Sequence, residues 1–415
     1  MRKLILLLFS ILFSLIICEI ILHLLVKPNP YSYGILFDIE LPPKVILPLN
    51  QIVGPEEAVL TRNNWYHGLV VNGDKITKGD LWGILREDEF LGFTSKENAV
   101  TTNRWWQSNN IGARSNKTTH SFKSPFKERI LIFGNSYAQS SRVPQHQTID
   151  FYLNHIGPDV EALNFGVDGY GMAQSYLRFQ TYKDKLEFDR VILFFVPKAD
   201  LERDINVHRY LGLNWLSSYS INIQPRYIIK NGELTLIQSP YKNLDKLVEN
   251  NRNSISDKMK NHLRAYDSFY FKFWHETTPI LDNLMLVKLL KSKIYNKKKT
   301  LLKESVMNPD SEAVQVTKKI IASMNQDVKR QGGQFTLVIL PTIGDLYDYD
   351  YIPEFKKKWK DMVTTICSDG IVCLDLMEDF NEIPYESFDT GYDKTHYGPK
   401  TNRRIAEIII QRALN

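Results

Sequence analysis

The chain has 415 residues, of which 43% are hydrophobic and 24% are charged, with 21 Gly and 18 Pro. These proportions are typical of a globular protein and exclude disordered, collagen-like and coiled-coil chains. The formal net charge of +5 is too small to indicate nucleic-acid binding, and three cysteines are too few to build a disulfide scaffold.

The N-terminus begins with Met1-Arg2-Lys3 and continues as an apolar run over residues 4–26. As a helix, this run would cover about 35 Å, which exceeds the ~30 Å of a hydrocarbon core. A cleaved signal peptide and a retained anchor both fit such a run. We favour an anchor over residues 1–27, because the stretch around Cys18 has no small-residue cleavage pattern. With the basic end kept in the cytoplasm, the rest of this single-pass chain would lie outside it, in the periplasm or at the cell surface.

Residues 28–125 are predicted to form a stalk and an N-terminal extension. The prolines that cluster between residues 28 and 55 indicate an extended segment leaving the membrane. Residues 56–125 contain many aromatic side chains but no clear period, so no elements are predicted there.

From residue 126 to the C-terminus, apolar runs of strand length alternate with segments of helical spacing. Strands are predicted over 129–133, 160–165, 190–196, 335–340 and 371–376. Helices are predicted over 148–156, 172–179, 311–330, 353–367 and 402–414. This alternation predicts an α/β domain in which helices cover both faces of a parallel sheet.

A largely helical insertion over residues 201–310 interrupts this domain. It opens with a predicted β-hairpin over 226–237, around Asn231-Gly232. Residues 241–304 then contain 14 Lys or Arg against seven Asp or Glu. A solvated helix face, contact with anionic lipid headgroups and contact with an acidic polymer are all open interpretations, whereas nucleic acid is not expected outside the membrane.

Two cysteines near the C-terminus, Cys367 and Cys373, would lie in an oxidising compartment. A glycine-containing turn between them makes a local disulfide possible, and two separate buried thiols are the alternative.

Ser136 follows the first predicted strand of the α/β domain, in Gly134-Asn135-Ser136. Ligands of open parallel sheets bind beyond the carboxyl ends of the strands, so a hydroxyl there could be functional. On this evidence alone, an ordinary turn or a helix N-cap is the commoner interpretation.

A second candidate group, Asp393-Lys394-Thr395-His396, precedes the last predicted helix. An imidazole can take a proton from a hydroxyl near neutral pH, and a carboxylate three residues earlier can curl back to hold it. Ser136, His396 and Asp393 together would make an activated nucleophile, its base and an orienting acid. The alternative is a surface loop without function.

These blocks resemble those of the SGNH (GDSL-like) hydrolase superfamily, which has a G-D-S block after the first strand and D-x-x-H before the last helix. A third block between them, residues 164–171, is similar to the one in which a glycine donates its backbone N–H to the oxyanion, here Gly169. A weaker likeness at 110–114, and the apolar N-terminus, resemble membrane-anchored relatives. The resemblance implies a flavodoxin-like three-layer sandwich and a triad of Ser136, His396 and Asp393.

The chain departs from this pattern in two places. Asn135 replaces the Asp of G-D-S, and Ala199 stands where the family has an Asn that completes the oxyanion hole. Loss of one such donor costs about 10²–10³ in kcat. Lys198 could supply a charged donor in its place, beside the amides of Ser136 and Gly169.

The resemblance therefore implies a serine esterase or an acyl (acetyl) transferase that acts on an ester of a carbohydrate or lipid. The alternative is a catalytically degenerate carbohydrate-binding or envelope scaffold protein, which Ala199 and Asn135 would favour. Neither cofactor nor metal is expected, since the sequence contains no H-E-x-x-H pair, no Walker-type loop and no complete dinucleotide fingerprint.

Overall fold

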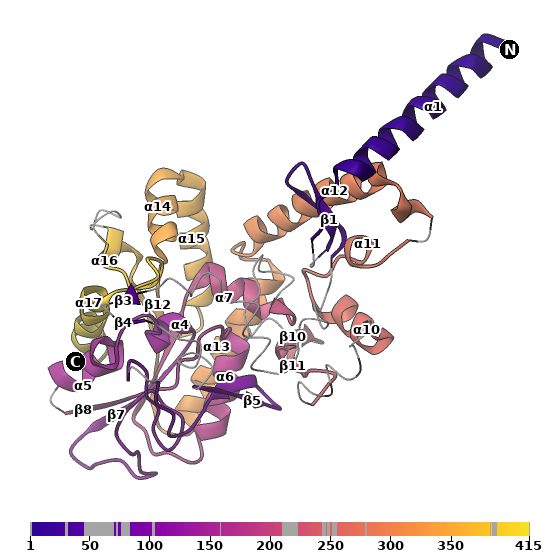
Figure 1. Cartoon of the computed structure of the whole chain (residues 1–415). Coiled ribbons are helices and arrows are strands. Elements are labelled where there is room, and N and C mark those ends of the chain that lie inside the picture. The colour runs from indigo at the N-terminus through magenta and orange to yellow at the C-terminus, as the bar shows by residue number, and fades with distance from the viewer. Residues whose placement is uncertain are drawn as a thin grey trace.

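The computed structural model describes the chain apart from residues 1, 30–31, 45–69, 72–73, 76–83, 102–103, 158, 210–222, 243–245, 247–249, 251–254, 279, 382, 384–387 and 415. Figure 1 shows a larger α/β body and, beside it, a smaller group of elements from which the N-terminal helix projects.

The larger body is built around a five-stranded parallel sheet with the order β13-β12-β9-β7-β8. Its strands are β7 (Glu128–Phe133), β8 (Val160–Asn164), β9 (Arg190–Phe195), β12 (Gln334–Ile339) and β13 (Cys373–Asp375). In chain order, the second strand lies at one edge and the first strand lies next to it, as in flavodoxin-like folds. The predicted α/β class is confirmed.

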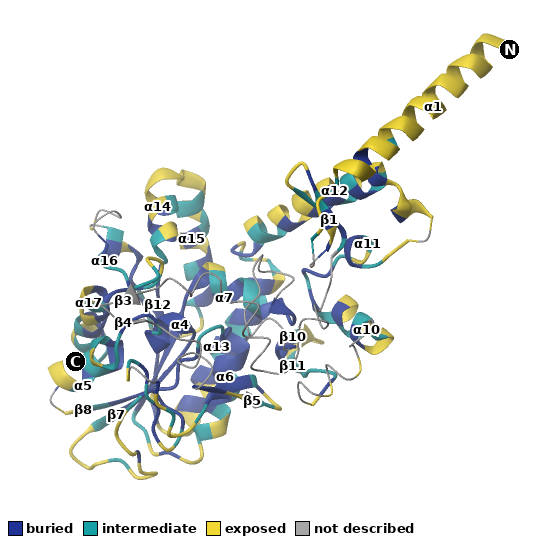
Figure 2. Ribbon diagram, in the orientation of Figure 1, coloured by how far each residue is buried: buried dark blue, intermediate teal, exposed yellow. Residues whose placement is uncertain are grey.

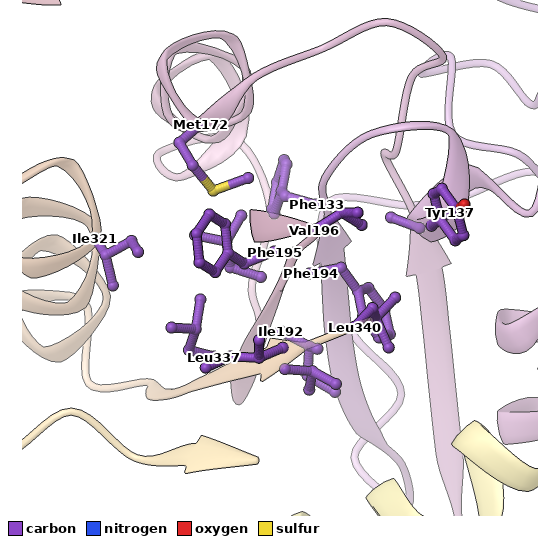
Figure 3. Packing of buried hydrophobic residues seen from close by; sticks show 14 of the residues in the cluster. Phe133, Tyr137, Met172, Ile192, Phe194, Phe195, Val196, Ile321, Leu337 and Leu340 are labelled. Atoms are coloured by element: carbon purple, nitrogen blue, oxygen red, sulfur yellow. The ribbon is translucent and has the colours of Figure 1, made fainter. Parts of the chain in front are cut away.

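Helices cover both faces of the sheet (Figure 1). α5 (Ile149–Ile156) and α17 (Pro399–Ile409) pack together on one face, and α6 (Met172–Tyr182) and α13 (Glu312–Arg330) pack together on the other. A strand covered on both faces needs apolar residues throughout, and every residue of β9 is buried. Figure 3 shows Met172 of α6 and Ile321 of α13 on the side of the sheet that carries Phe195. These are the three layers of the predicted sandwich.

The other predicted elements of this domain are also present, with ends that differ by a few residues. They are α15 (Pro353–Ile366) and the continuation of α17 as a π-helical turn, η6 (Ile410–Leu414). The remaining short elements are α4 (Ser136–Gln139), η2 (Gln145–Gln147), α7 (Pro197–Asp204) and α16 (Met377–Asn381). α14 (Ile343–Tyr351) was not predicted, because its Tyr- and Asp-rich sequence has little apolar periodicity. Thr342 and Asp345 form a capping box at its start.

The N-terminal helix, α1 (Arg2–Leu25), is long and apolar enough to cross a membrane. Part of the expected stalk is not extended. Residues 32–44 instead form a hairpin of β1 (Ser32–Leu36) and β2 (Ile39–Lys44), because Leu36 and Leu41 bury their side chains against α1 and the insertion. The rest of the proline-rich segment, over 45–55, lies outside the described residues.

The N-terminal extension contributes two short hairpins. They are β3 (Val70–Val71) with β4 (Asp74–Lys75), and β5 (Leu85–Asp88) with β6 (Gly92–Ser95). The second hairpin packs on the α/β body through Phe93, whose ring meets that of Tyr170 edge-on at 5.3 Å. The aromatic residues that lacked a period in the sequence therefore include side chains that pack against the sheet domain.

The insertion contains the predicted hairpin, now β10 (Arg226–Lys230) and β11 (Glu233–Ile237), and several helices. These are α10 (Asp257–Tyr266), α11 (Lys272–His275), the 3-10 turn η4 (Leu281–Asn283) and α12 (Met285–Ser305). α12 carries the lysine-rich stretch and lies next to α1 (Figure 1).

Cys367 and Cys373 form the local disulfide, with their Cα atoms 6.0 Å apart. The bridge joins the end of α15 to the first residue of β13. Cys18, in α1, is a free thiol.

Candidate active site

The turn after β7 presents Ser136 at the start of α4. Gly134 has a φ of +144°, and a Cβ atom there would lie 2.8 Å from that of Ala138, so the turn requires glycine. Asn135 caps α4, because its Oδ1 accepts the N–H of Tyr137 at 2.9 Å. The N-cap expected here is therefore present, but Asn135 supplies it. Ser136 is left with its hydroxyl free to face the loop before α17.

That loop brings His396 and Asp393 to the serine. Ser136 Oγ lies 2.8 Å from His396 Nε2, although the two residues are 260 positions apart. His396 Nδ1 lies 2.5 Å from Asp393 Oδ2. Asp393 Oδ1 also accepts the backbone N–H groups of Thr395 and His396, so the carboxylate holds its own loop in shape. The structure thus assembles all three residues in one hydrogen-bonded row.

The charge state of Asp393 is suited to an orienting acid. Burial alone would raise its pKa, but the hydrogen bond and charge of His396, together with Arg142, hold the pKa of this carboxyl far below its usual range. Asp393 is therefore an anion at neutral pH and well below it. An anion at Nδ1 keeps the proton on that nitrogen and leaves Nε2 as an acceptor for the serine hydroxyl.

The ring of Tyr137, the residue after the serine, packs against the imidazole of His396. Its ring centroid lies 4.6 Å from that of His396, and its hydroxyl donates to the carbonyl of Thr395 at 3.1 Å. Burial raises the pKa of this phenol, so it stays a neutral donor. Sequence reasoning passed over this residue, because an aromatic side chain in a turn carries no specific signal.

Arg142 is a second residue that the sequence did not single out. Its Nε donates to Asp393 Oδ2 at 3.3 Å, and its Nη2 donates to Asp168 Oδ2 at 2.8 Å. Burial would raise the pKa of Asp168, but the charge and hydrogen bond of Arg142, together with the charges of His396 and Arg203, lower it. Because Asp168 directly precedes Gly169, this buried guanidinium joins the carboxylate of Asp393 to the loop of the predicted oxyanion donor.

Gly169 lies in a loop that packs against α4. Its φ is +85°, in the left-handed region that favours glycine. The N–H of Asp168 donates to Gln139 Oε1 at 3.2 Å, and a Cβ atom on Gly166 would meet the amide nitrogen of Gln139 at 2.5 Å. The loop is therefore held close to the helix that begins with Ser136, while the role of the Gly169 amide remains a prediction.

The first turn of α7, which directly follows β9 and is called the β9 turn below, lies beside the serine turn but carries different groups. Ala199 is partly buried against the core, and its methyl side chain offers no hydrogen-bond donor. Lys198 Nζ lies 3.0 Å from Asp348 Oδ2 on α14. The ammonium group therefore pairs with a carboxylate on α14, and its role as a substitute oxyanion donor stays a prediction.

Asp200 ties these two turns together. Its Oδ1 accepts the amide of Asn135 at 2.8 Å, and its Oδ2 accepts the N–H of Val196 at 2.7 Å. Burial raises the pKa of this carboxyl to about 6. Asn135 thus has a structural partner in the residue next to Ala199.

Arg114, the last residue of the stretch 110–114, has a structural role. Its buried guanidinium donates to the backbone carbonyls of Gln139 and Ser140 at 2.6 Å each and to that of Val143 at 2.7 Å. Burial lowers its pKa to about 10, so the group stays cationic. Arg114 therefore clamps the loop that follows α4 and carries Arg142.

No group of three or more His, Cys, Asp or Glu side chains among the described residues is arranged to hold a metal ion. The chemistry that this site can perform with its own groups is proton transfer by His396 and nucleophilic attack by Ser136.

No family model matches the chain, and no curated protein matches its sequence. Among solved structures, it is similar to a member of the lipolytic protein G-D-S-L family from Veillonella parvula, with 10% identity and a TM-score of 0.35. It is also similar to the acetyl xylan esterase AlAXEase, with 12% identity and a TM-score of 0.33. Each likeness covers 69% of this chain and 99% of the other.

Proposed function

We propose that this chain is a membrane-anchored serine esterase or acyl (acetyl) transferase of the SGNH type, which acts outside the cytoplasm on an ester of a carbohydrate or lipid. The observation that carries this proposal is the row Ser136 Oγ, His396 Nε2, His396 Nδ1 and Asp393 Oδ2, with contacts of 2.8 and 2.5 Å. This is the geometry of a nucleophile, its general base and the acid that orients the base.

In the first half-reaction, Ser136 Oγ attacks the ester carbonyl carbon while His396 Nε2 takes the hydroxyl proton. The oxyanion of the tetrahedral intermediate lies against the amides of Ser136 and Gly169. Collapse of the intermediate breaks the bond to the leaving alcohol, which receives the proton from His396. An acyl group is then esterified to Ser136.

In the second half-reaction, water or an acceptor hydroxyl loses its proton to His396 and attacks the acyl-serine. Water gives a carboxylic acid, and a sugar or lipid hydroxyl gives a new ester. In both cases Ser136 recovers its proton. Hydrolysis and transfer therefore use the same three residues, and they differ in which hydroxyl reaches the acyl group first.

Two features support a location outside the cytoplasm. The disulfide between Cys367 and Cys373 fits an oxidising compartment. The basic residues Arg2 and Lys3 at the start of α1 fit a cytoplasmic N-terminus.

The full-length chain in detergent should hydrolyse p-nitrophenyl acetate and should be labelled covalently by a fluorophosphonate probe. Ser136→Ala should abolish both, and Ser124→Ala, which changes an exposed serine, should change neither. A native chain that is neither labelled nor active on a broad ester panel, and that transfers no acetyl group to glycan, would exclude the proposed enzyme. That result would favour the carbohydrate-binding or scaffold alternative, for which Ala199 is the supporting observation.

A further inference from the structure

The anchor helix is held by the insertion through a carboxylate. Glu19 of α1 accepts the backbone N–H groups of Met285 and Leu286, at the N-terminus of α12. The N-cap position of α12 is Leu284, whose side chain has no acceptor for these groups. A carboxylate at a helix N-terminus satisfies otherwise unpaired N–H donors and is stabilised by the helix dipole. The side chain of Glu19 is only 16% exposed, so these two amides replace water molecules that would otherwise donate hydrogen bonds to the carboxylate.

Apolar and polar contacts extend this junction. Leu22 of α1 is buried with Leu36 and Leu41 of the β1–β2 hairpin and with Met285. Further along α12, Lys288 Nζ lies 3.9 Å from the centroid of the Tyr33 ring and donates to the carbonyl of Pro42 at 3.1 Å. The hairpin and α12 therefore form a socket for the last turns of α1, and a cleaved signal peptide would leave that socket empty.

With α1 as the anchor, the socket would place the start of α12 just inside the outer boundary of the hydrocarbon core. If the hydrocarbon core begins at Leu4, twenty helical residues reach its far boundary near His23. Glu19 then lies about 6 Å short of that boundary, and so does the N-terminus of α12 that it caps. Figure 2 shows α1 exposed along its length up to the point where it meets α12.

The residues around this N-terminus are apolar and uncovered. The exposed fractions are 81% for Ile280, 53% for Leu281, 44% for Leu284 and 40% for Leu286. Exposed lysines follow along α12, namely Lys293, Lys297 and Lys298. Figure 1 shows α12 leading from the end of α1 toward the α/β body. Near α1 the exposed side chains are apolar, and further along α12 the exposed lysines alternate with the exposed Leu290, Ile294 and Leu301. An apolar start followed by a stretch with both apolar and cationic side chains suits a helix that passes from acyl chains into anionic headgroups.

We propose that η4 and the first turn of α12, with Ile280, Leu281, Leu284 and Leu286, insert into the outer interfacial layer of the lipid bilayer beside α1. The partner is the bilayer itself, with acyl chains against these residues and anionic headgroups near the lysines. This second contact fixes the insertion on the membrane, and through it the height of the site at Ser136. The inference rests on the proposed anchoring and is independent of the proposed chemistry.

The test uses the full-length chain in nanodiscs of phosphatidylcholine and phosphatidylglycerol, with Cys18→Ser as background. Single cysteines (Leu281→Cys or Leu284→Cys) carry an NBD fluorophore, and quenching by lipids with shallow or deep doxyl groups reports depth. Leu15→Cys, about 16 Å along the helix from Leu4, is the control for the bilayer centre. Tyr351→Cys, on α14 and 64% exposed, is the control for water.

We expect blue-shifted emission at positions 281 and 284, with at least twofold stronger quenching by shallow than by deep doxyl groups. Position 15 should show the reverse preference, and position 351 should show neither effect. Water-like labels at 281 and 284 with a quenched label at 15 would overturn the lipid contact and leave the anchor intact. Blue-shifted labels without quenching would mean that protein, such as a second copy of the chain, covers this face. A water-like label at 15 would overturn the anchoring itself.

A second variant separates the role of Glu19 from the apolar contact. Glu19→Ala removes the acceptor for the α12 amides, so shallow quenching at position 284 should fall at least twofold while position 15 is unchanged. Unchanged quenching at 284 would show that Glu19 does not position α12.

Discussion

The turns that follow β7 and β9 lie side by side at the carboxyl ends of these neighbouring strands. They differ in how well their residues suit the proposed chemistry. The β7 turn carries Ser136, which meets the imidazole of His396 at 2.8 Å. The β9 turn carries Ala199 and Lys198, of which the first has no side-chain donor and the second pairs with Asp348. The residues of the proposed nucleophile and base therefore meet, whereas the side-chain amide that the sequence resemblance led us to expect beside them is absent at Ala199.

The same two turns share one buried hydrogen bond, between the amide of Asn135 and the carboxylate of Asp200. A donor in one turn and an acceptor in the other keep the turns together. Asn135 thus anchors the turn in which Ser136 lies. Mutations can alter the framework of this turn and the proposed oxyanion hole separately, and four predictions use this.

The largest effect should come from the β7 side of the site. Asp393→Asn removes the anion that orients His396, and we expect kcat to fall about 10⁴-fold. Steady-state hydrolysis of p-nitrophenyl acetate measures the loss, and circular dichroism checks the fold. His146→Asn, which changes an exposed histidine, is the control. A loss of less than tenfold would mean that this triad is not the catalytic unit.

Arg114→Met tests how the β7 turn is held. Loss of the guanidinium removes the donor from the buried carbonyls of Gln139 and Val143, whereas that of Ser140 keeps the backbone N–H of Val143 at 3.3 Å. At 1–3 kcal/mol for each unsatisfied group, partly relieved by water, we expect the free energy of unfolding to fall by about 4 kcal/mol. Urea denaturation in detergent measures it, with Arg404→Met on the exposed face of α17 as the control. Equal stability in the two variants would contradict the clamp.

Asp200 predicts a pH dependence of stability. Burial raises its pKa to about 6 from 3.8, so between these values the folded state holds a proton that the unfolded state has lost. Its contribution to the free energy of unfolding therefore falls as pH rises from about 4 to about 6, by roughly 3 kcal/mol in total. Asp200→Asn should remove this part of the slope, so the gap between variant and wild type should change across that window. Parallel curves would show that Asp200 is not perturbed.

Ala199→Asn should have the smallest effect, and in the favourable direction. If the β9 turn lacks an oxyanion donor, a side-chain amide at position 199 should raise kcat about tenfold. The gain should be less than the full 10²–10³, because the neighbouring residues are not arranged to orient an Asn side chain. Ala199→Asp has the same shape without the donor and should give no gain. Activity that is equal in the wild type and both variants would mean that another group already completes the oxyanion hole.

Much of the domain could be predicted from the sequence because its signals are local. Apolar runs such as β9, the Asn-Gly turn of the β10–β11 hairpin and the short loop between Cys367 and Cys373 each depend on neighbouring residues. Ser136, Asp393 and His396 were found for the same reason, since each lies in a short block next to a predicted element. Where local signals were weak, as in α14, sequence reasoning missed the helix.

Only the tertiary structure decided which distant groups meet. The parallel sheet brings Ser136 and His396 together across 260 positions, and Arg142 and Arg114 acquire roles only because the folded chain places carboxylates and carbonyls around them. The proline-rich segment after α1 was expected to be extended, yet part of it folds against α12, because apolar side chains from three separate segments bury one another there. Secondary-structure propensity depends on adjacent residues, whereas burial and long-range hydrogen bonds depend on the whole folded chain.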